Sequence, residues 1–194
     1  MANLMAKMFN WEASRPKYMA DEIVERLHLR EGDAVADIGS GGGFFTFLAS
    51  AKVGENGTVY AVDTNGSNLA FIETQAAKNG LGNVKTVHAE GEDLDLPEGG
   101  IDRVFLRNVY HHLEEPVSYF GGIRKFLKPD GKVVIIDHSE TTKGGFVRFF
   151  KHCTPEEDIV KALAQSGFKL SEKADFLPSQ SFLVFEMTEG SDGA

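Results

Sequence analysis

The sequence predicts an α/β protein built on a largely parallel sheet, and three observations lead to this fold class. Segments with apolar residues at helical spacing alternate with short apolar runs along almost the whole chain. The short runs are nearly continuous in apolar residues, which is typical of parallel strands buried on both faces. The 194 residues suit one domain and suffice to bury a sizeable core. Helices are therefore expected on both faces of the sheet.

The elements are expected in alternation from residue 16 onward. Apolar residues at helical spacing predict a first helix over residues 16–29, and these are Met19, Ile23, Val24 and Leu27. Apolar runs predict strands over residues 34–38, 58–62, 84–88, 101–106 and 132–137. The segments between them predict helices over residues 44–52, 69–79 and 117–127. The last helix is expected to stop at the Lys-Pro-Asp-Gly turn signal of residues 128–131.

The C-terminal part of the chain departs from this alternation. Thr154 as N-cap and Pro155 in the first turn predict a helix that ends at Gly167. Two strands are expected after it, over residues 168–173 and 181–187, as a hairpin-like pair that closes one sheet edge. Residues 188–194 are expected to form a flexible tail.

Composition and charge exclude several classes of function. The chain carries 20 basic and 29 acidic residues, a formal net charge of −9, which argues against non-specific binding to nucleic acid or to an anionic membrane. A local basic patch remains compatible with this balance. The lone Cys153 excludes an internal disulfide or a multi-thiolate metal site, and the spacing of Asp137, His138 and His152 matches no standard metal site. No secretory signal or membrane-spanning run is seen, so we expect a cytoplasmic protein.

The most informative segment joins the strand of residues 34–38 to the helix that follows it. It reads Asp-Ile-Gly-Ser-Gly-Gly-Gly over residues 37–43. Glycine lets the backbone approach a ligand closely, and the N-terminus of a helix offers free N–H groups. A glycine cluster also makes ordinary turns, but the strand–glycine–helix context favours a nucleotide-type ligand.

Two common nucleotide motifs do not fit this segment. The dinucleotide fingerprint G-x-G-x-x-G requires a third glycine at Phe44 when counted from Gly39, or at Thr46 when counted from Gly41. A phosphate-binding P-loop would need Lys-Ser or Lys-Thr after the glycines, and neither is present. The glycine register therefore argues against a nicotinamide dehydrogenase.

The pattern D-x-G-x-G-x-G resembles the first motif of class I S-adenosylmethionine-dependent methyltransferases. The resemblance covers roughly residues 20–140 and implies a Rossmann-like three-layer sandwich, with a seven-stranded sheet whose last strand is antiparallel. It implies that the glycine loop wraps the amino-acid end of S-adenosylmethionine and that the preceding acid orients it. The residues expected there are Asp37, Gly39, Ser40, Gly41 and Gly43.

Acidic residues after the next two strands extend the resemblance. Asp63 ends its strand where the family binds the ribose hydroxyls, with Thr64 beside it; the alternative is a solvated Asp that starts a turn. After the third strand the family often reads G-D-A-E-x-L-P-L-P, with adenine contacts. Glu90, Gly91 and Glu92 match part of this motif, whereas Asp95 replaces a proline. The alternative there is a solvated acidic loop.

The residues that follow the fourth strand are expected to line the part of the site where the substrate meets the transferred methyl group. Arg107 and Asn108 stand where the family lines the cofactor cleft, and the segment over residues 109–113 resembles that of the ubiquinone/menaquinone C-methyltransferase-like group. His111 or His112 could act as a general base, because imidazole titrates near neutral pH. One of them is expected to be structural and the other to line the site. The Asn/Asp-Pro-Pro-aromatic motif typical of nucleic-acid amino methylation is absent.

Two further segments are candidates for the walls of the site. Residues 143–152 form either a substrate wall or an amphipathic surface helix. Residues 1–20 form the N-terminal cap that related enzymes fold over the cofactor, and Trp11 is equally consistent with a surface role. We expect a single methyltransferase domain over residues 1–194.

The sequence thus predicts a methyltransferase that uses S-adenosylmethionine and acts on a small molecule, with no metal, nucleic-acid or membrane partner. The acceptor atom and the oligomeric state are left open. The alternatives are a cofactor-binding protein without transferase activity and a methyltransferase that acts on protein or RNA.

Overall fold

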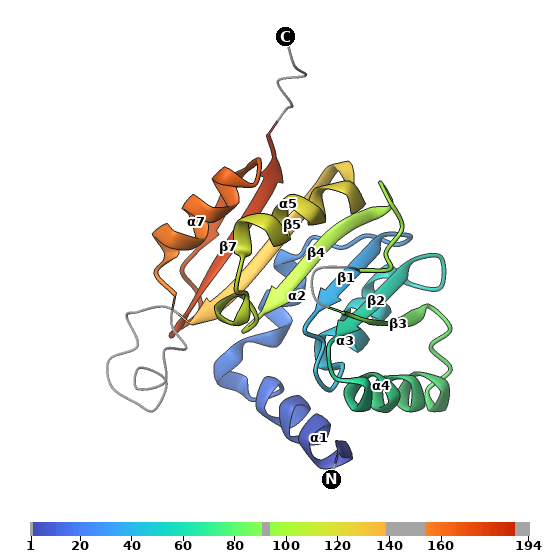
Figure 1. Cartoon of the computed structure of the whole chain (residues 1–194). Coiled ribbons are helices and arrows are strands. Elements are labelled where there is room, and N and C mark those ends of the chain that lie inside the picture. The colour runs from blue at the N-terminus through green and yellow to red at the C-terminus, as the bar shows by residue number, and fades with distance from the viewer. Residues whose placement is uncertain (1, 91–93, 139–153, 189–194) are drawn as a thin grey trace.

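The computed structural model describes residues 2–90, 94–138 and 154–188 (Figure 1). Within these ranges seven strands form one sheet in the order β3-β2-β1-β4-β5-β7-β6. Strand β7 is antiparallel to both of its neighbours, and the remaining strands run parallel to one another, which confirms the predicted fold. The strands are β1 (Ala34–Ile38), β2 (Thr58–Asp63), β3 (Val84–His88), β4 (Ile101–Arg107), β5 (Leu127–His138), β6 (Phe168–Ala174) and β7 (Gln180–Met187).

Helices cover both faces of the sheet because each central strand is apolar on both sides (Figure 1). Val104 and Leu106 of β4 face the core under α5 and α7, whereas Phe105 faces the core under α2 and α3. The helices are α1 (Ala2–Ala13), α2 (Ala20–Arg26), α3 (Phe44–Val53), α4 (Gly66–Lys78), α5 (Pro116–Ile123) and α7 (Glu156–Gln165). Short 3-10 turns occupy Pro16–Tyr18, Tyr110–His112 and Arg124–Phe126.

The N-terminal region differs from the sequence prediction. Helix α1 was not anticipated, and the helix expected over residues 16–29 is broken into a 3-10 turn and α2. Met19 causes the break, since its φ of 47° is left-handed and its N–H closes the 3-10 turn on the Pro16 carbonyl. His28, with φ 50°, ends the segment early.

One predicted turn and one predicted helix N-cap also differ from the structure. The predicted turn of residues 128–131 lies inside β5, where the pairing with β4 shifts register between Ile101 and Arg103. Residues 128–131 are thus accommodated as an irregularity within β5 and do not form a separate turn that precedes the strand. At α7 the N-cap is Pro155 and no side chain caps the helix, so the prediction for Thr154 was wrong.

The strand order reverses between β1 and β4, because the chain runs outward from β1 to β3 and then returns to β4. In open α/β sheets ligands bind beyond the carboxyl ends of the strands at this reversal. Among the described residues, no helix is both long enough and apolar enough to cross a bilayer.

Candidate functional site

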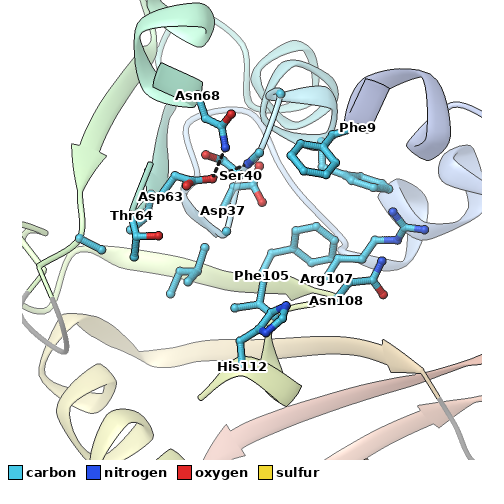
Figure 2. Close-up of a pocket in the computed structure, with 18 of the residues that line it drawn as sticks. Phe9, Asp37, Ser40, Asp63, Thr64, Asn68, Phe105, Arg107, Asn108 and His112 are labelled. Carbon is cyan, nitrogen blue, oxygen red and sulfur yellow. Dashed lines mark hydrogen bonds between the residues drawn. The ribbon is translucent and has the colours of Figure 1, made fainter. Parts of the chain in front are cut away.

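A cavity of about 900 Å³ lies at this strand reversal, between the carboxyl ends of the central strands and α1 (Figure 2). Nine of the residues singled out from the sequence line it, and they are Asp37, Gly39, Ser40, Gly41, Asp63, Thr64, Arg107, Asn108 and His112. Figure 2 shows Asp63, Thr64 and Asn68 on one side of the cavity and Arg107 and Asn108 on the other. The cavity therefore has two chemically different ends.

Three other predicted residues do not belong to this lining. Gly43 is the N-cap of α3, packed so that a β-carbon would meet Ile72. The Glu90 side chain is exposed and lies 3.7 Å from the His88 ring nitrogen Nδ1. His111 is buried beside the cavity. Gly91 and Glu92 lie outside the described residues, as does the predicted substrate wall of residues 143–152.

The glycine loop is held from two sides. The Gly41 N–H donates to Asp63 Oδ2 at 2.8 Å, and Asn10 Nδ2 donates to the Gly42 carbonyl at 2.7 Å. Gly41 has φ +55°, a conformation that favours glycine, and a β-carbon there would face Phe9 at 3.6 Å. A β-carbon on Gly42 would collide with the Ala6 carbonyl and Asn10. The loop thus needs glycine both for its turn and for close contact with α1.

Asp37 is a buried carboxylate at the base of the loop. It accepts a 2.6 Å hydrogen bond from Thr46 Oγ1. Burial raises the pKa of Asp37 to about 6; the bond from Thr46 lowers it, and the negative charge of Asp63 raises it further. Next to it, the buried hydroxyl of Ser40 has no hydrogen-bond partner among the described residues. The loop therefore presents an acceptor and an uncommitted hydroxyl to a ligand.

Asp63 at the end of β2 organises the opposite side. Its Oδ2 accepts from Gly41 N and, at 3.3 Å, from Asn68 Nδ2, while its Oδ1 accepts from Asn65 N at 2.8 Å. The hydrogen bond from Asn65 N belongs to the turn that the sequence indicated as the alternative role of Asp63. A carboxylate has about four acceptor positions, so Asp63 shapes the loop and retains capacity for a ligand hydroxyl.

Arg107 ends β4 among aromatic rings. Its guanidinium carbon lies 4.8 Å from the Tyr18 ring centre and 5.2 Å from that of Phe45, and Nη2 donates to Gln180 Oε1 at 3.3 Å. Gln180 in turn donates to Asn108 Oδ1. Burial lowers the pKa of Arg107, and Tyr18 and Glu12 act in the opposite direction. This end of the cavity is a desolvated cation framed by π-faces.

The adjacent histidines take different positions. His111 Nδ1 lies 2.8 Å from Asp137 Oδ1, and the His111 N–H donates to Asp137 Oδ2 at 3.1 Å. Both side chains are buried. The ring of His112 contacts that of His111 in a tilted arrangement, with centres 4.1 Å apart, and His112 lines the cavity. Asp137 therefore fixes the orientation of His111, and His112 is the imidazole that a ligand can meet.

Sequence reasoning missed several polar residues around the cavity, namely Asn10, Asn68 and Gln180. Asn68 and Gln180 are buried polar residues within otherwise apolar faces, at 6% and 4% exposure. They stand directly before the predicted helix of residues 69–79 and the predicted strand of residues 181–187, so the sequence carried no reason to expect their burial. Asn10 was missed because α1 was not predicted. Among the described residues, no cluster of three metal-ligating side chains occurs.

Comparison with known proteins agrees with this geometry. Residues 29–176 match a family model described as a methyltransferase domain. The ubiquinone/menaquinone biosynthesis C-methyltransferase UbiE of Citrobacter koseri is 28% identical, over 97% of this chain and 82% of that relative. Demethylmenaquinone methyltransferase of Geobacillus kaustophilus is 24% identical over 67% of this chain, and the match spans only 56% of that relative.

A solved structure shows the same fold. The structure of a methyltransferase from Aquifex aeolicus, described as SAM-dependent, superposes with a TM-score of 0.80 at 24% identity, over 92% of this chain and 96% of that one. The family model covers about three quarters of the sequence, including every strand from β1 to β6. The chain therefore belongs to the class I S-adenosylmethionine-dependent methyltransferases, a family whose cofactor is S-adenosylmethionine.

Proposed function

We propose that the protein binds S-adenosylmethionine across the carboxyl ends of β1, β2 and β4 and transfers its methyl group to a small-molecule acceptor. The observation that carries this proposal is the glycine loop, hydrogen-bonded to Asp63 on one side and to Asn10 on the other beside one continuous cavity. The quinone methyltransferases among its relatives support a small acceptor. The acidic composition and lone cysteine support action in the cytoplasm on a substrate other than nucleic acid.

The donor set of the cavity fits the charges of this cofactor. Asp37 and Asp63 offer acceptors for an ammonium and for ribose hydroxyls, and Ser40 offers a buried hydroxyl that lacks a partner among the described residues. Ile38, Val62 and Ala89 supply apolar lining near Thr64, where a purine ring would be accommodated. We propose these residues, with Gly39 and Gly41, as the cofactor-binding set. Glu90, Gly91 and Glu92 remain proposals for the adenine end.

The protein contributes mainly binding and alignment. The bound cofactor supplies an electrophilic methyl group, so the chain must orient the acceptor and exclude water. Arg107 and Asn108, held by Gln180, define the wall opposite Asp63. Phe9, Phe45 and Phe105 make that region apolar, which keeps water from competing with the acceptor.

A proton must also leave when the acceptor is a hydroxyl or an amine. We propose that His112 accepts it, since this residue lines the same cavity as Arg107 and Asn108. His111 acts as a positioning residue, because its ring is hydrogen-bonded to buried Asp137 and contacts the ring of His112. This divides the two histidines into one general base and one support.

Calorimetric titration with S-adenosylhomocysteine, with NAD as a parallel control, tests the cofactor assignment. We expect saturable binding of S-adenosylhomocysteine alone. Asp63→Ala should weaken it by about 1–3 kcal/mol, because the ribose hydroxyls and the Gly41 N–H both lose a charged acceptor. Asp95→Ala, on the acidic segment after β3, is the matched control and should leave affinity unchanged. Binding of NAD, or equal affinity of Asp63→Ala and wild type, would contradict the assignment.

Methyl transfer needs a separate assay. Release of S-adenosylhomocysteine during a screen of phenolic, quinol, amine and thiol acceptors should identify the acceptor class. His112→Ala should lower kcat with little effect on cofactor affinity. Cofactor binding without turnover on any acceptor would instead favour a non-catalytic cofactor-binding protein.

A further inference from the structure

Helix α1 presents its small residues inward and its large apolar residues outward. Ala6, Asn10 and Ala13, at positions i, i+4 and i+7, form the inner face, and Ala6 and Ala13 are 0% and 8% exposed. Leu4, Met8 and Trp11 share the same spacing on the opposite face and are 71%, 53% and 62% exposed. An ordinary surface helix shows the reverse pattern. Close contact with the glycine loop explains the small inner residues, because Gly42 packs directly on Ala6 and Asn10.

The outer face is too apolar to be explained by packing within the described chain. Met5 and Phe9, 50% and 41% exposed, lie four residues apart on one flank of this face, and Phe9 also faces the glycine loop. These residues make up most of the large exposed apolar side chains of the described structure. Contiguous exposed apolar patches on soluble domains mark interaction sites. Figure 1 shows α1 at the periphery of the molecule, next to α4.

The N-terminal segment that forms α1 and the turn after it has a charge opposite in sign to that of the whole chain. Residues 1–19 contain three basic residues, Lys7, Arg15 and Lys17, against one acidic residue, Glu12. The full chain has 29 acidic and 20 basic residues. Lys7 is exposed beside the apolar face, and Arg15, paired at 3.4 Å with Glu12, lies over the Trp11 ring. Apolar and aromatic side chains flanked by cations are the composition of helices that lie in the surface of an anionic bilayer.

We propose that the outer face of α1 docks on the surface of an anionic phospholipid membrane. The helix lies flat, with Leu4, Met8 and Trp11 entering the headgroup region and the neighbouring cations contacting lipid phosphates. The edge of the same helix lines the cavity through Phe9, Asn10 and Glu12. Docking therefore brings the cavity beside the membrane. This proposal departs from the sequence expectation of no membrane partner, which rested on overall charge and on the lack of a spanning segment.

Trp11 makes the test direct, because it is the only tryptophan of the chain. Full-length protein is mixed with vesicles of phosphatidylcholine alone, or of phosphatidylcholine with one third phosphatidylglycerol, and flotation and tryptophan emission are recorded. We expect flotation and a blue shift of emission with the anionic vesicles, at least fivefold weaker binding to neutral vesicles, and loss of binding as salt is raised.

Variants separate docking from misfolding. Leu4→Glu combined with Met8→Glu should abolish flotation and the blue shift while S-adenosylhomocysteine affinity is retained. The matched control is Val117→Glu combined with Leu170→Glu, at exposed apolar positions on α5 and β6, and it should bind vesicles as the wild type does. Failure of cofactor binding would overturn the proposed function and leave vesicle binding as a separate result.

Two results would overturn the membrane proposal. One is wild-type protein that neither floats nor shifts its emission with anionic vesicles at low salt. The other is a wild-type dimer, measured by light scattering, that the α1 variant converts to monomer, which would assign the face to a second copy of the chain.

Discussion

The two carboxylates of the cavity are in very different environments. Asp37 is buried and accepts a hydrogen bond from Thr46, whereas Asp63 accepts three N–H groups at the edge of the cavity. Burial places the pKa of Asp37 at about 6, within the range where enzymes are assayed. The charge of Asp37 is therefore expected to change with modest acidification, and the ligand it faces should respond.

Affinity for S-adenosylmethionine should fall as pH drops below about 6. The cofactor carries an ammonium and a sulfonium, both of which favour ionised Asp37, and each pH unit below the pKa removes up to about tenfold in affinity. Titration calorimetry between pH 5 and 8 measures this. Asp37→Asn should bind more weakly at pH 8 and show little dependence on pH, and a parallel decline in the variant would refute the assignment to Asp37.

The effect of Asp37 on the free energy of unfolding should vary with pH in the opposite direction to its effect on cofactor affinity. The folded pKa of about 6 exceeds the usual 3.8, so the folded state takes up an extra proton between these values. The free energy of unfolding of the ligand-free protein, relative to Asp37→Asn, should then rise as pH is lowered from 6 to 4. Urea unfolding of both proteins across this range provides the measurement.

At the scale of elements, the glycine loop and α1 are fitted to each other. Asn10 donates to Gly42, whose missing β-carbon leaves room for the Ala6 carbonyl. The loop is consequently both the proposed cofactor site and the surface on which α1 packs. A substitution in the glycine loop should therefore alter the packing of α1, and a substitution in α1 should alter the loop.

Gly42→Ala should displace α1 without unfolding the sheet. The added carbon would overlap Ala6 and Asn10, at a cost of about 1–3 kcal/mol for overpacking. Limited trypsin digestion, followed by mass spectrometry, should show faster cleavage after Lys7, which lies within α1. Gly121→Ala, where a β-carbon meets nothing within 4 Å, is the control and should digest as the wild type does. Equal rates for all three proteins would show that α1 does not depend on this contact.

The sequence predicted those elements whose own residues carry the signal, such as an apolar run or a cluster of glycines. β1 and β3 were placed with the observed bounds, and the site at the end of β1 followed from the glycines. Helix α1 was missed although Leu4, Met8 and Trp11 have helical spacing; these residues face outward, so the spacing here marks an exposed apolar face and not the core. Nor could the sequence separate His111 from His112, since their roles depend on Asp137, which is 26 residues away in the chain.

For the whole molecule, the sheet is completed by β7, which lies between β5 and β6. Its residues Phe182, Leu183 and Phe185 are fully buried and contact cores on both faces. The predicted hairpin-like closure of one edge thus takes the form of a strand inserted next to the parallel part of the sheet. The stability of the whole fold should depend on this strand.

Phe185→Ala should destabilise the protein by about 3–5 kcal/mol, because a fully buried ring is removed from the core under α7. Urea unfolding monitored by circular dichroism gives the value. Leu170→Ala, on the neighbouring edge strand and 39% exposed, is the control and should cost less than about 1 kcal/mol. Comparable losses in the two variants would mean that β7 is peripheral to the cooperative fold.

The strand order also has a consequence during synthesis on the ribosome. β6 is made before β7 and, among the strands that the structure describes, pairs with β7 alone, so the nascent chain cannot place β6 until residues 180–187 have emerged. Until then the edge of β5 is open, with Val134 and Ile136 among its apolar residues. An unpaired apolar edge is the surface that chaperones bind and that nascent chains use to aggregate. The parallel half of the sheet can form early, whereas the second half waits for its last strand.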